Sequence, residues 1–336
     1  MLAIGATKVF LYNMKIKEPC RSAFLVVGMH RSGTSAFAGT LGRLGLSVPA
    51  GLMAPSPANA NGYYESGELA KLHNRVLRSA GSRWDDWSAI EPSWFAEPAA
   101  KAYATDIVRF LDGQFARAAS FVVKDPRMCR MVPIWRQALE SFGAKTHVVI
   151  PLRHPDAVAA SLVARDGLLA GESYLLWLRH LLDAEQATRD LSRVFVVYDD
   201  LLADWRAAVG AMEAQLNYRW PRSPDEAAAD IGGFLDPKLR HHRPRHRYAA
   251  RGDRAAGLAF RGWDVFSRLD QQQAISADSI ATLAALRDEL DQIPSVRRLP
   301  LGIGSATGHV VRLVSRVRSR LAAAERRTLP VPKAGE

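Results

Sequence analysis

The segment over residues 24–35, FLVVGMHRSGTS, joins a short apolar run to a glycine-bounded loop and a helix start. Gly28 and Gly33 enclose four residues, which is the spacing of a phosphate-binding P-loop. The apolar run is typical of a buried parallel strand, and Thr34 and Ser35 are good N-cap residues for the helix that should follow. Such a helix start attracts anions through its backbone N–H groups and its dipole. The segment therefore predicts an anion site, with an ordinary strand–turn–helix corner as the alternative.

The position that carries lysine in a P-loop nucleoside triphosphatase is occupied by Thr34. That lysine reaches the outer phosphates, so its absence argues against triphosphate hydrolysis. The positive charge lies inside the loop at Arg31, and Ser32 adds a further donor.

A second segment, residues 146–153, is another apolar strand pattern. Pro155 follows at a position suited to the first turn of a helix, and Ser161 lies farther along that helix. Arg153 and Ser161 are eight positions apart (161 − 153 = 8), so the strand end and the helix face can converge on one phosphate.

Taken together, these segments resemble the nucleotide-binding motifs of the sulfotransferases that use 3′-phosphoadenosine 5′-phosphosulfate. The resemblance implies a 5′-phosphosulfate loop formed by Arg31, Ser32, Gly33, Thr34 and Ser35, and a 3′-phosphate pair formed by Arg153 and Ser161. Residues 59–65, 121–127, 194–202 and 234–243 resemble other parts of bacterial members, so the resemblance covers about residues 22–245.

The catalytic residues are also implied by this resemblance. The cytosolic sulfotransferases have lysine where this chain has Arg31, and they use a histidine base that the Lys124 segment lacks. The pattern therefore points to the carbohydrate- or protein-type branch, in which a glutamate is the base, and away from small phenol substrates. Glu65 is the expected base, with capping of the helix near Ser66 as its alternative role. Asp125 is the second candidate base, and Lys124 together with Arg31 is expected to stabilise the leaving group.

The implied activity is transfer of a sulfuryl group to a hydroxyl of a glycan or glycolipid acceptor, without a metal. A small-molecule or nucleotide kinase with an altered P-loop is the first alternative, and it would require ATP and Mg²⁺. A non-catalytic basic protein that binds nucleic acid or a membrane surface is the second alternative, although no nucleic-acid-binding motif is present.

The fold class expected from the pattern is α/β, with a mainly parallel central sheet flanked by helices, as in P-loop nucleotide kinases and sulfotransferases. A helical C-terminal extension should follow the sheet domain. The strands are predicted at 24–28, 120–124, 146–152 and 193–198. The helices are predicted at 34–45, 66–80, 99–118, 128–142, 155–166, 172–191 and 201–216, with two more stretches within 274–327.

Three regions are expected along the chain: a tail at 1–21, the α/β domain at 22–245 and a basic, mostly helical extension at 246–336. Residues 217–233 have the composition of a linker or surface excursion. Trp84, Trp87 and Trp94 suggest either a sugar-stacking wall or an aromatic cap on the core, and the cap is favoured.

The net charge of +11 suits an anionic ligand or surface. Arginines crowd residues 240–254, which are either a flap over the nucleotide or a solvated tail. A further basic, apolar-striped helix near 310–321 either packs on the domain or contacts a membrane peripherally. The two cysteines, Cys20 and Cys129, form no disulfide framework, and no apolar run suggests a signal core or a membrane span. The expected location is therefore cytoplasmic, including the inner membrane face.

Overall fold

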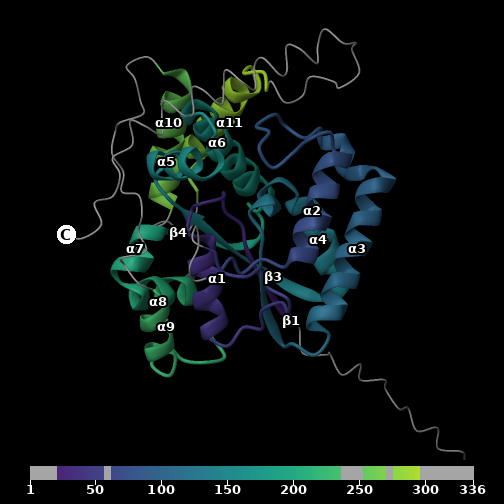
Figure 1. The fold of residues 1–336 in the computed structure, drawn as a ribbon, viewed down its shortest axis with the longest axis vertical. Coiled ribbons are helices and arrows are strands. Elements are labelled where there is room, and N and C mark those ends of the chain that lie inside the picture. The colour runs from purple at the N-terminus through teal and green to yellow at the C-terminus, as the bar shows by residue number, and fades with distance from the viewer. Residues whose placement is uncertain (1–20, 57–61, 236–252, 270–274, 296–336) are drawn as a thin grey trace, which may run out of the picture.

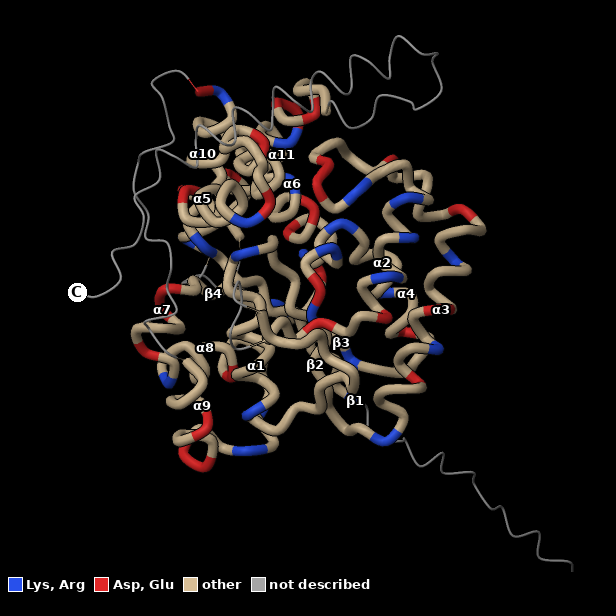
Figure 2. The backbone as a smooth tube through the Cα atoms, in the orientation of Figure 1, with Lys and Arg blue, Asp and Glu red and all other residues tan. Residues whose placement is uncertain are grey.

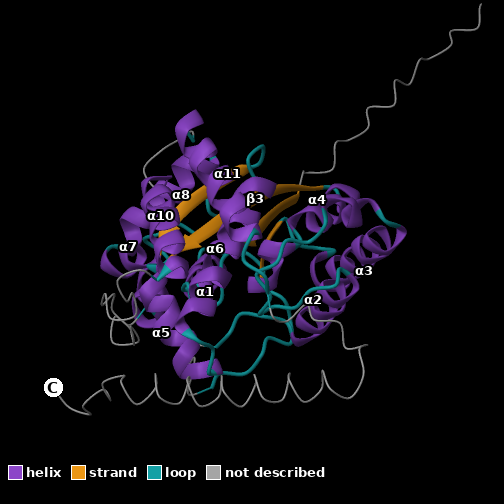
Figure 3. Ribbon diagram, turned by 90° about the horizontal axis from the view of Figure 1, so that it is seen from above, coloured by secondary structure: helices purple, strands orange, loops and turns teal. Residues whose placement is uncertain are grey.

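The computed structural model describes residues 21–56, 62–235, 253–269 and 275–295. Within them, a four-stranded parallel sheet has the order β2-β1-β3-β4. Helices cover both faces of this sheet (Figures 1 and 3). These features confirm the predicted α/β class and all four predicted strands. The strands are β1 (Arg21–Val26), β2 (Ser120–Lys124), β3 (Ala144–Leu152) and β4 (Ser192–Val197).

Alternate residues of β1 enter two different cores because successive side chains of a strand point to opposite faces. Ala23 and Leu25 join the larger core, whereas Phe24 and Val26 join the smaller one. Burial on both faces explains why the strands are continuous apolar runs. The larger core includes side chains of α2 (Gly67–Ser79), α3 (Pro98–Phe115), α4 (Val132–Phe142), α5 (Pro155–Asp166) and α6 (Ala170–Ala187). The smaller core includes α1 (Thr34–Arg43) and α8 (Trp205–Leu216).

Two helices from the expected C-terminal extension pack on the larger core. These are α10 (Arg254–Leu269) and α11 (Ala277–Asp291), and both contact α6. The predicted boundary at 245/246, most of the 240–254 arginine cluster, the helix near 310–321 and the tail at 1–20 lie outside the described residues. In the part of the chain that is described, no helix is both long enough and apolar enough to cross a membrane.

Two predicted helices need correction. The helix expected from 128 begins at Val132, because Asp125 caps a separate 3₁₀ turn, η2 (Pro126–Arg130). The helix expected over 201–216 is divided into α7 (Tyr198–Ala203) and α8, where Asp204 caps the second helix.

The linker prediction for 217–233 is wrong in part. A short helix, α9 (Ala228–Phe234), occupies its end and buries Ile231 and Phe234 in the smaller core. Ile231 and Phe234 are the only large apolar residues in this seven-residue helix, which is too weak a pattern to separate it from a loop.

The tryptophan-rich loop caps the larger core, as favoured from the sequence. Trp87 and Trp94 are only 4% and 7% exposed, and Trp94 belongs to the 3₁₀ turn η1 (Pro92–Ala96). The Trp87 indole N–H donates to the carbonyl of Ile293 at 3.1 Å. This bond ties the loop to the segment after α11.

Candidate active site

The carboxyl ends of all four strands meet at one edge of the sheet, where ligands bind in open α/β folds. The glycine-bounded loop follows β1, and Lys124 is the last residue of β2. Arg153 follows β3, and Tyr198 follows β4. Basic segments lie at this edge near α5 and α2 (Figure 2). The sheet therefore brings the two halves of the predicted nucleotide site to the same place.

The loop after β1 has the backbone shape that its glycine spacing suggests. Arg31 and Gly33 both have positive φ values, of 67° and 81°, and Gly33 is the N-cap of α1. Thr34 and Ser35 are therefore the first two residues of the helix and not its cap, which corrects the prediction from residue preference. Without a side-chain cap, the start of α1 is suited to an anion that bonds its N–H groups.

Gly33 is required at its position by the neighbouring ring of Tyr198. A Cβ atom at Gly33 would lie 2.1 Å from Tyr198 Cδ2, and the φ of 81° is itself unfavourable for other residues. The guanidinium group of Arg153 lies over the ring of Tyr198. Its central carbon, Cζ, is 5.1 Å from the ring centroid. The loop, the ring and the arginine therefore form one packed unit.

We expect Gly33→Ala to lower the free energy of unfolding by about 2 kcal/mol or more, because it combines backbone strain with a steric clash. Gly81→Ala is a matched control, since Gly81 has a φ of 67° but none of the residues that the structure describes lies within 4 Å of the added Cβ. The control should lose only about 1 kcal/mol. Urea denaturation measures both, and equal losses would show that Tyr198 does not restrict the loop.

Arg31, Arg153 and Ser161 form one polar cluster. Arg31 Nε donates to Ser161 Oγ at 2.7 Å, and an Arg153 terminal N–H donates to the Arg31 carbonyl at 2.9 Å. Burial, together with the charges of Arg165 and Arg153, lowers the pKa of Arg31. Positive charge is thus concentrated in a partly desolvated place, where an anion would relieve the repulsion.

The loop also holds an unsatisfied donor. Ser32 is 1% exposed, and its hydroxyl has no hydrogen-bond partner among the described residues. Buried hydroxyl groups are normally bonded, and a ligand oxygen is a suitable partner in a loop of this shape. The donor set of the loop therefore fits a phosphate or sulfate group.

Lys124, Glu65 and Ser35 form a second cluster beside the start of α1. Lys124 Nζ donates to Glu65 Oε1 at 2.5 Å and to Ser35 Oγ at 3.3 Å, and both members of the ion pair are buried. A guanidinium nitrogen of Arg127 lies 3.8 Å from the other carboxylate oxygen of Glu65. The helix cap itself is Ser66, whose hydroxyl accepts from the N–H of Leu69. Glu65 is therefore positioned against Lys124 and does not cap α2.

Asp125, the second candidate base, has other partners. Its carboxylate accepts hydrogen bonds from the backbone and side chain of Arg127 and lies 3.4 Å from His73 Nδ1. Burial alone would raise the pKa of Asp125, but His73 and Arg127 hold it below its ordinary value. His73 in turn accepts a bond from Trp135, so this chain of contacts fixes η2 in place.

His30 lies in the loop of the candidate site, and its surroundings could not be predicted from the sequence. It is 8% exposed, and its ring packs against Trp84 and His180. Burial, with the charges of Arg127 and Arg165, lowers its pKa well below the ordinary value. His30 is therefore a neutral packing residue of the loop at neutral pH.

The buried histidines make stability depend on pH. Burial lowers the pKa of His180 to about 3 and that of His147 to about 4, and His30 shifts in the same direction. The unfolded chain takes up these protons near pH 6.5 while the folded chain does not, so stability falls as the pH drops below 6.5. His180 and His147 together should remove about 4 kcal/mol between pH 7.5 and pH 5. Chemical denaturation at the two pH values tests this, and an unchanged unfolding free energy would contradict it.

The predicted site residues thus fall into two adjoining groups at one sheet edge. Sequence reasoning missed Tyr198, Arg165 and Arg127 as neighbours of the site. Tyr198 and Arg127 did lie within segments that resemble the family, at residues 194–202 and 121–127, whereas Arg165 had no such signal. Among the described residues, no group of three or more His, Cys, Asp or Glu side chains is arranged to hold a metal ion.

No protein-family model matches this chain, and no curated protein matches it. Similar solved structures include the sulfotransferase STF1 from Mycobacterium tuberculosis H37Rv, which is 17% identical over 63% of this chain and 70% of that chain, with a TM-score of 0.38. Another is the sulfotransferase domain of the olefin synthase from Synechococcus PCC 7002, which is 17% identical over 79% of this chain and 94% of that chain, with a TM-score of 0.36. Likeness of this degree does not establish a shared activity, so the function has to be argued from the site.

Proposed function

We propose that this protein is a sulfotransferase that moves a sulfuryl group from 3′-phosphoadenosine 5′-phosphosulfate to a hydroxyl of a glycan or glycolipid. One observation carries the proposal. A phosphate-type loop without the P-loop lysine lies between an arginine–serine cluster and a buried lysine–glutamate pair. The first cluster suits a second phosphate on the nucleotide, and the pair suits proton transfer at a hydroxyl.

The loop and the arginine–serine cluster would hold the nucleotide. Ser32, Gly33, Thr34 and Ser35 would surround the 5′-phosphosulfate, because this loop provides a helix start and a buried hydroxyl that has no hydrogen-bond partner in the described part of the chain. Arg153 and Ser161 would bind the 3′-phosphate. Arg31 would serve both ends, since it belongs to the loop and donates to Ser161.

The lysine–glutamate pair would carry out the proton transfer and charge stabilisation. When bound, 3′-phosphoadenosine 5′-phosphosulfate supplies the sulfuryl group, which passes to the acceptor oxygen as 3′,5′-adenosine diphosphate leaves. Glu65 would take the proton of the acceptor hydroxyl, which is too weak an acid to ionise unaided. Lys124 and Arg31 would stabilise negative charge on the oxygen that separates from sulfur. Burial of the Lys124–Glu65 pair strengthens the electrostatic stabilisation by Lys124.

A transfer assay tests the proposal directly. Incubation with the ³⁵S-labelled donor and bacterial glycan or glycolipid fractions should give a labelled product together with stoichiometric 3′,5′-adenosine diphosphate. The kinase alternative instead requires ATP, Mg²⁺ and release or transfer of phosphate. Robust Mg²⁺-dependent phosphate release from ATP, without sulfuryl transfer, would overturn the proposal.

A further inference from the structure

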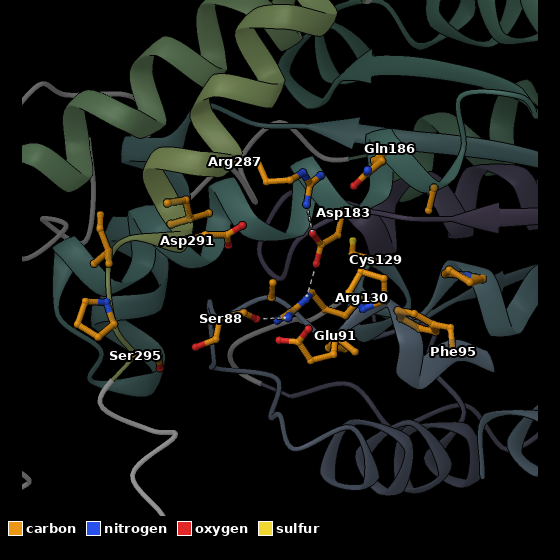
Figure 4. Close-up of a pocket in the computed structure, with 18 residues that line it drawn as sticks. Ser88, Glu91, Phe95, Cys129, Arg130, Asp183, Gln186, Arg287, Asp291 and Ser295 are labelled. Atoms are coloured by element: carbon orange, nitrogen blue, oxygen red, sulfur yellow. Dashed lines mark hydrogen bonds and ion pairs between the residues drawn. The ribbon is translucent and has the colours of Figure 1, made fainter. Parts of the chain in front are cut away.

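A separate pocket of about 800 Å³ lies on the α6 side of the molecule (Figure 4). It is formed by the loop at residues 88–95, η2, the end of α6, α11 and residues 293–295. The volume is within the range of pockets that hold drug-sized ligands. None of the residues assigned above to the nucleotide lines it.

The walls of this pocket are mainly apolar. Such walls exclude water and favour the apolar part of a ligand. The apolar lining includes Ile90, Pro92, Phe95, Pro133, Leu290 and Pro294.

The polar floor is built around Asp183. Arg130 donates from Nε to Asp183 Oδ2 at 2.7 Å, and Arg287 donates to Asp183 Oδ1 at 2.8 Å. The two terminal guanidinium nitrogens of Arg130 donate to the backbone carbonyls of Asp86 and Ser88, at 2.5 and 2.6 Å respectively. These guanidinium donors are already engaged, so they offer little to an added anion.

The charges at the pocket leave no positive excess for an anion. Three carboxylates (Glu91, Asp183 and Asp291) and two arginines line it, and Arg179, which pairs with Asp183 and Asp291, balances the remaining carboxylate. Glu91 is exposed, and the Asp291 side chain is 40% exposed. An anionic nucleotide is therefore poorly matched to this pocket, whereas an uncharged ligand with hydroxyl donors can use the carboxylate and amide oxygens.

The short turn η2 connects this pocket to the candidate active site. Arg127 of this turn faces the active site, with a guanidinium nitrogen 3.8 Å from the Glu65 carboxylate. Cys129 and Arg130 of the same turn line the pocket. Three residues of a 3₁₀ helix span about 6 Å. The pocket and the candidate active site therefore lie on two sides of the same short turn.

We infer that this pocket binds an uncharged amphiphile, an apolar body that carries hydroxyl groups, and that this ligand is the non-reacting part of the acceptor. Only the second part of this inference, the acceptor role, rests on the proposed function. The ligand class follows from the walls, the engaged arginines and the carboxylates, whatever reaction the protein catalyses.

Two matched probes test the ligand class. Octyl β-D-glucoside below its micellar concentration is uncharged, and octyl β-D-glucuronide differs from it by one carboxylate. Isothermal titration should show the glucoside binding at least about tenfold more tightly. Glu91→Lys, a change at an exposed position, should reduce or reverse that preference. Equal affinities for the two probes in the unmodified protein would overturn the inference.

A filling variant tests the location. Ala187 lines the pocket at the end of α6, so Ala187→Trp should weaken glucoside binding about tenfold or more. Ala102→Trp, at an exposed position on α3, should bind the probe normally. Both variants should bind 3′,5′-adenosine diphosphate like the parent, which also shows that the site is folded. Unchanged glucoside binding by Ala187→Trp would exclude this pocket.

The acceptor assignment has its own readout. In ³⁵S-transfer to octyl β-D-glucoside, Ala187→Trp should raise KM and leave kcat nearly unchanged. Normal KM despite lost probe binding would overturn the acceptor role. Glucoside binding in a protein that does not bind 3′,5′-adenosine diphosphate would count against the proposed function and not against the ligand class.

Discussion

Replacing Glu65 by glutamine is expected to reduce turnover about a hundredfold or more while leaving affinity for 3′,5′-adenosine diphosphate unchanged. Glutamine keeps an oxygen acceptor for the Lys124 ammonium group, which lies 2.5 Å from the carboxylate, but it cannot take a proton. The nucleotide contacts proposed for Arg153 and Ser161 do not involve Glu65. Initial rates with saturating donor, together with nucleotide titration, measure the two effects.

The matched control for Glu65→Gln is Glu68→Gln, an exposed position in the first turn of α2. This control should retain full turnover. Loss of the buried ion pair can also affect stability, so both variants need a melting curve at the assay pH. Normal turnover by Glu65→Gln with an inactive, folded Asp125→Asn would show that the base has been misassigned.

Arg153→Ala should weaken binding of 3′,5′-adenosine diphosphate about ten- to a hundredfold. A hydrogen bond to a charged group contributes about 1.5–3 kcal/mol, and the 3′-phosphate would lose such a bond. Binding of 5′-adenosine monophosphate, which lacks that phosphate, should change little. Calorimetric titration of both nucleotides gives the comparison.

An exposed arginine provides the control for Arg153→Ala. The Arg136 side chain is 40% exposed and pairs with Asp190, so Arg136→Ala should bind both nucleotides normally. Arg153 also contacts the carbonyl of Arg31 and the ring of Tyr198, so its removal can disturb the loop. If the affinity for both nucleotides falls equally, Arg153 supports the loop and does not recognise the 3′-phosphate.

Local patterns were sufficient for the sheet and for the choice of candidate residues. Four apolar runs gave the four strands, and glycine spacing located the loop with positive φ at Gly33. Because parallel strands share one carboxyl edge, a sheet built from these strands brings Arg31, Lys124 and Arg153 toward one another. The structure places all three at that edge.

Contacts between distant residues could not be read from these patterns. Arg31 and Ser161 are 130 positions apart, and the sequence motif paired Ser161 with Arg153 without showing that Arg31 bonds to it. The ring of Tyr198 against Gly33 and the burial of His30 beside His180 likewise depend on how helices and loops pack. The pocket beside η2 is assembled from four separate segments, none of which has a recognisable motif.

The central claim is that this loop selects a 3′-phosphorylated adenosine nucleotide and not a nucleoside triphosphate. One calorimetric series with 3′,5′-adenosine diphosphate, 5′-adenosine monophosphate and ATP plus Mg²⁺ tests it most directly. We predict that 3′,5′-adenosine diphosphate binds at least about tenfold more tightly than either of the others, since it alone can engage both the loop and the Arg153–Ser161 pair. Tight binding of ATP with Mg²⁺, combined with no detectable binding of 3′,5′-adenosine diphosphate, would contradict this account.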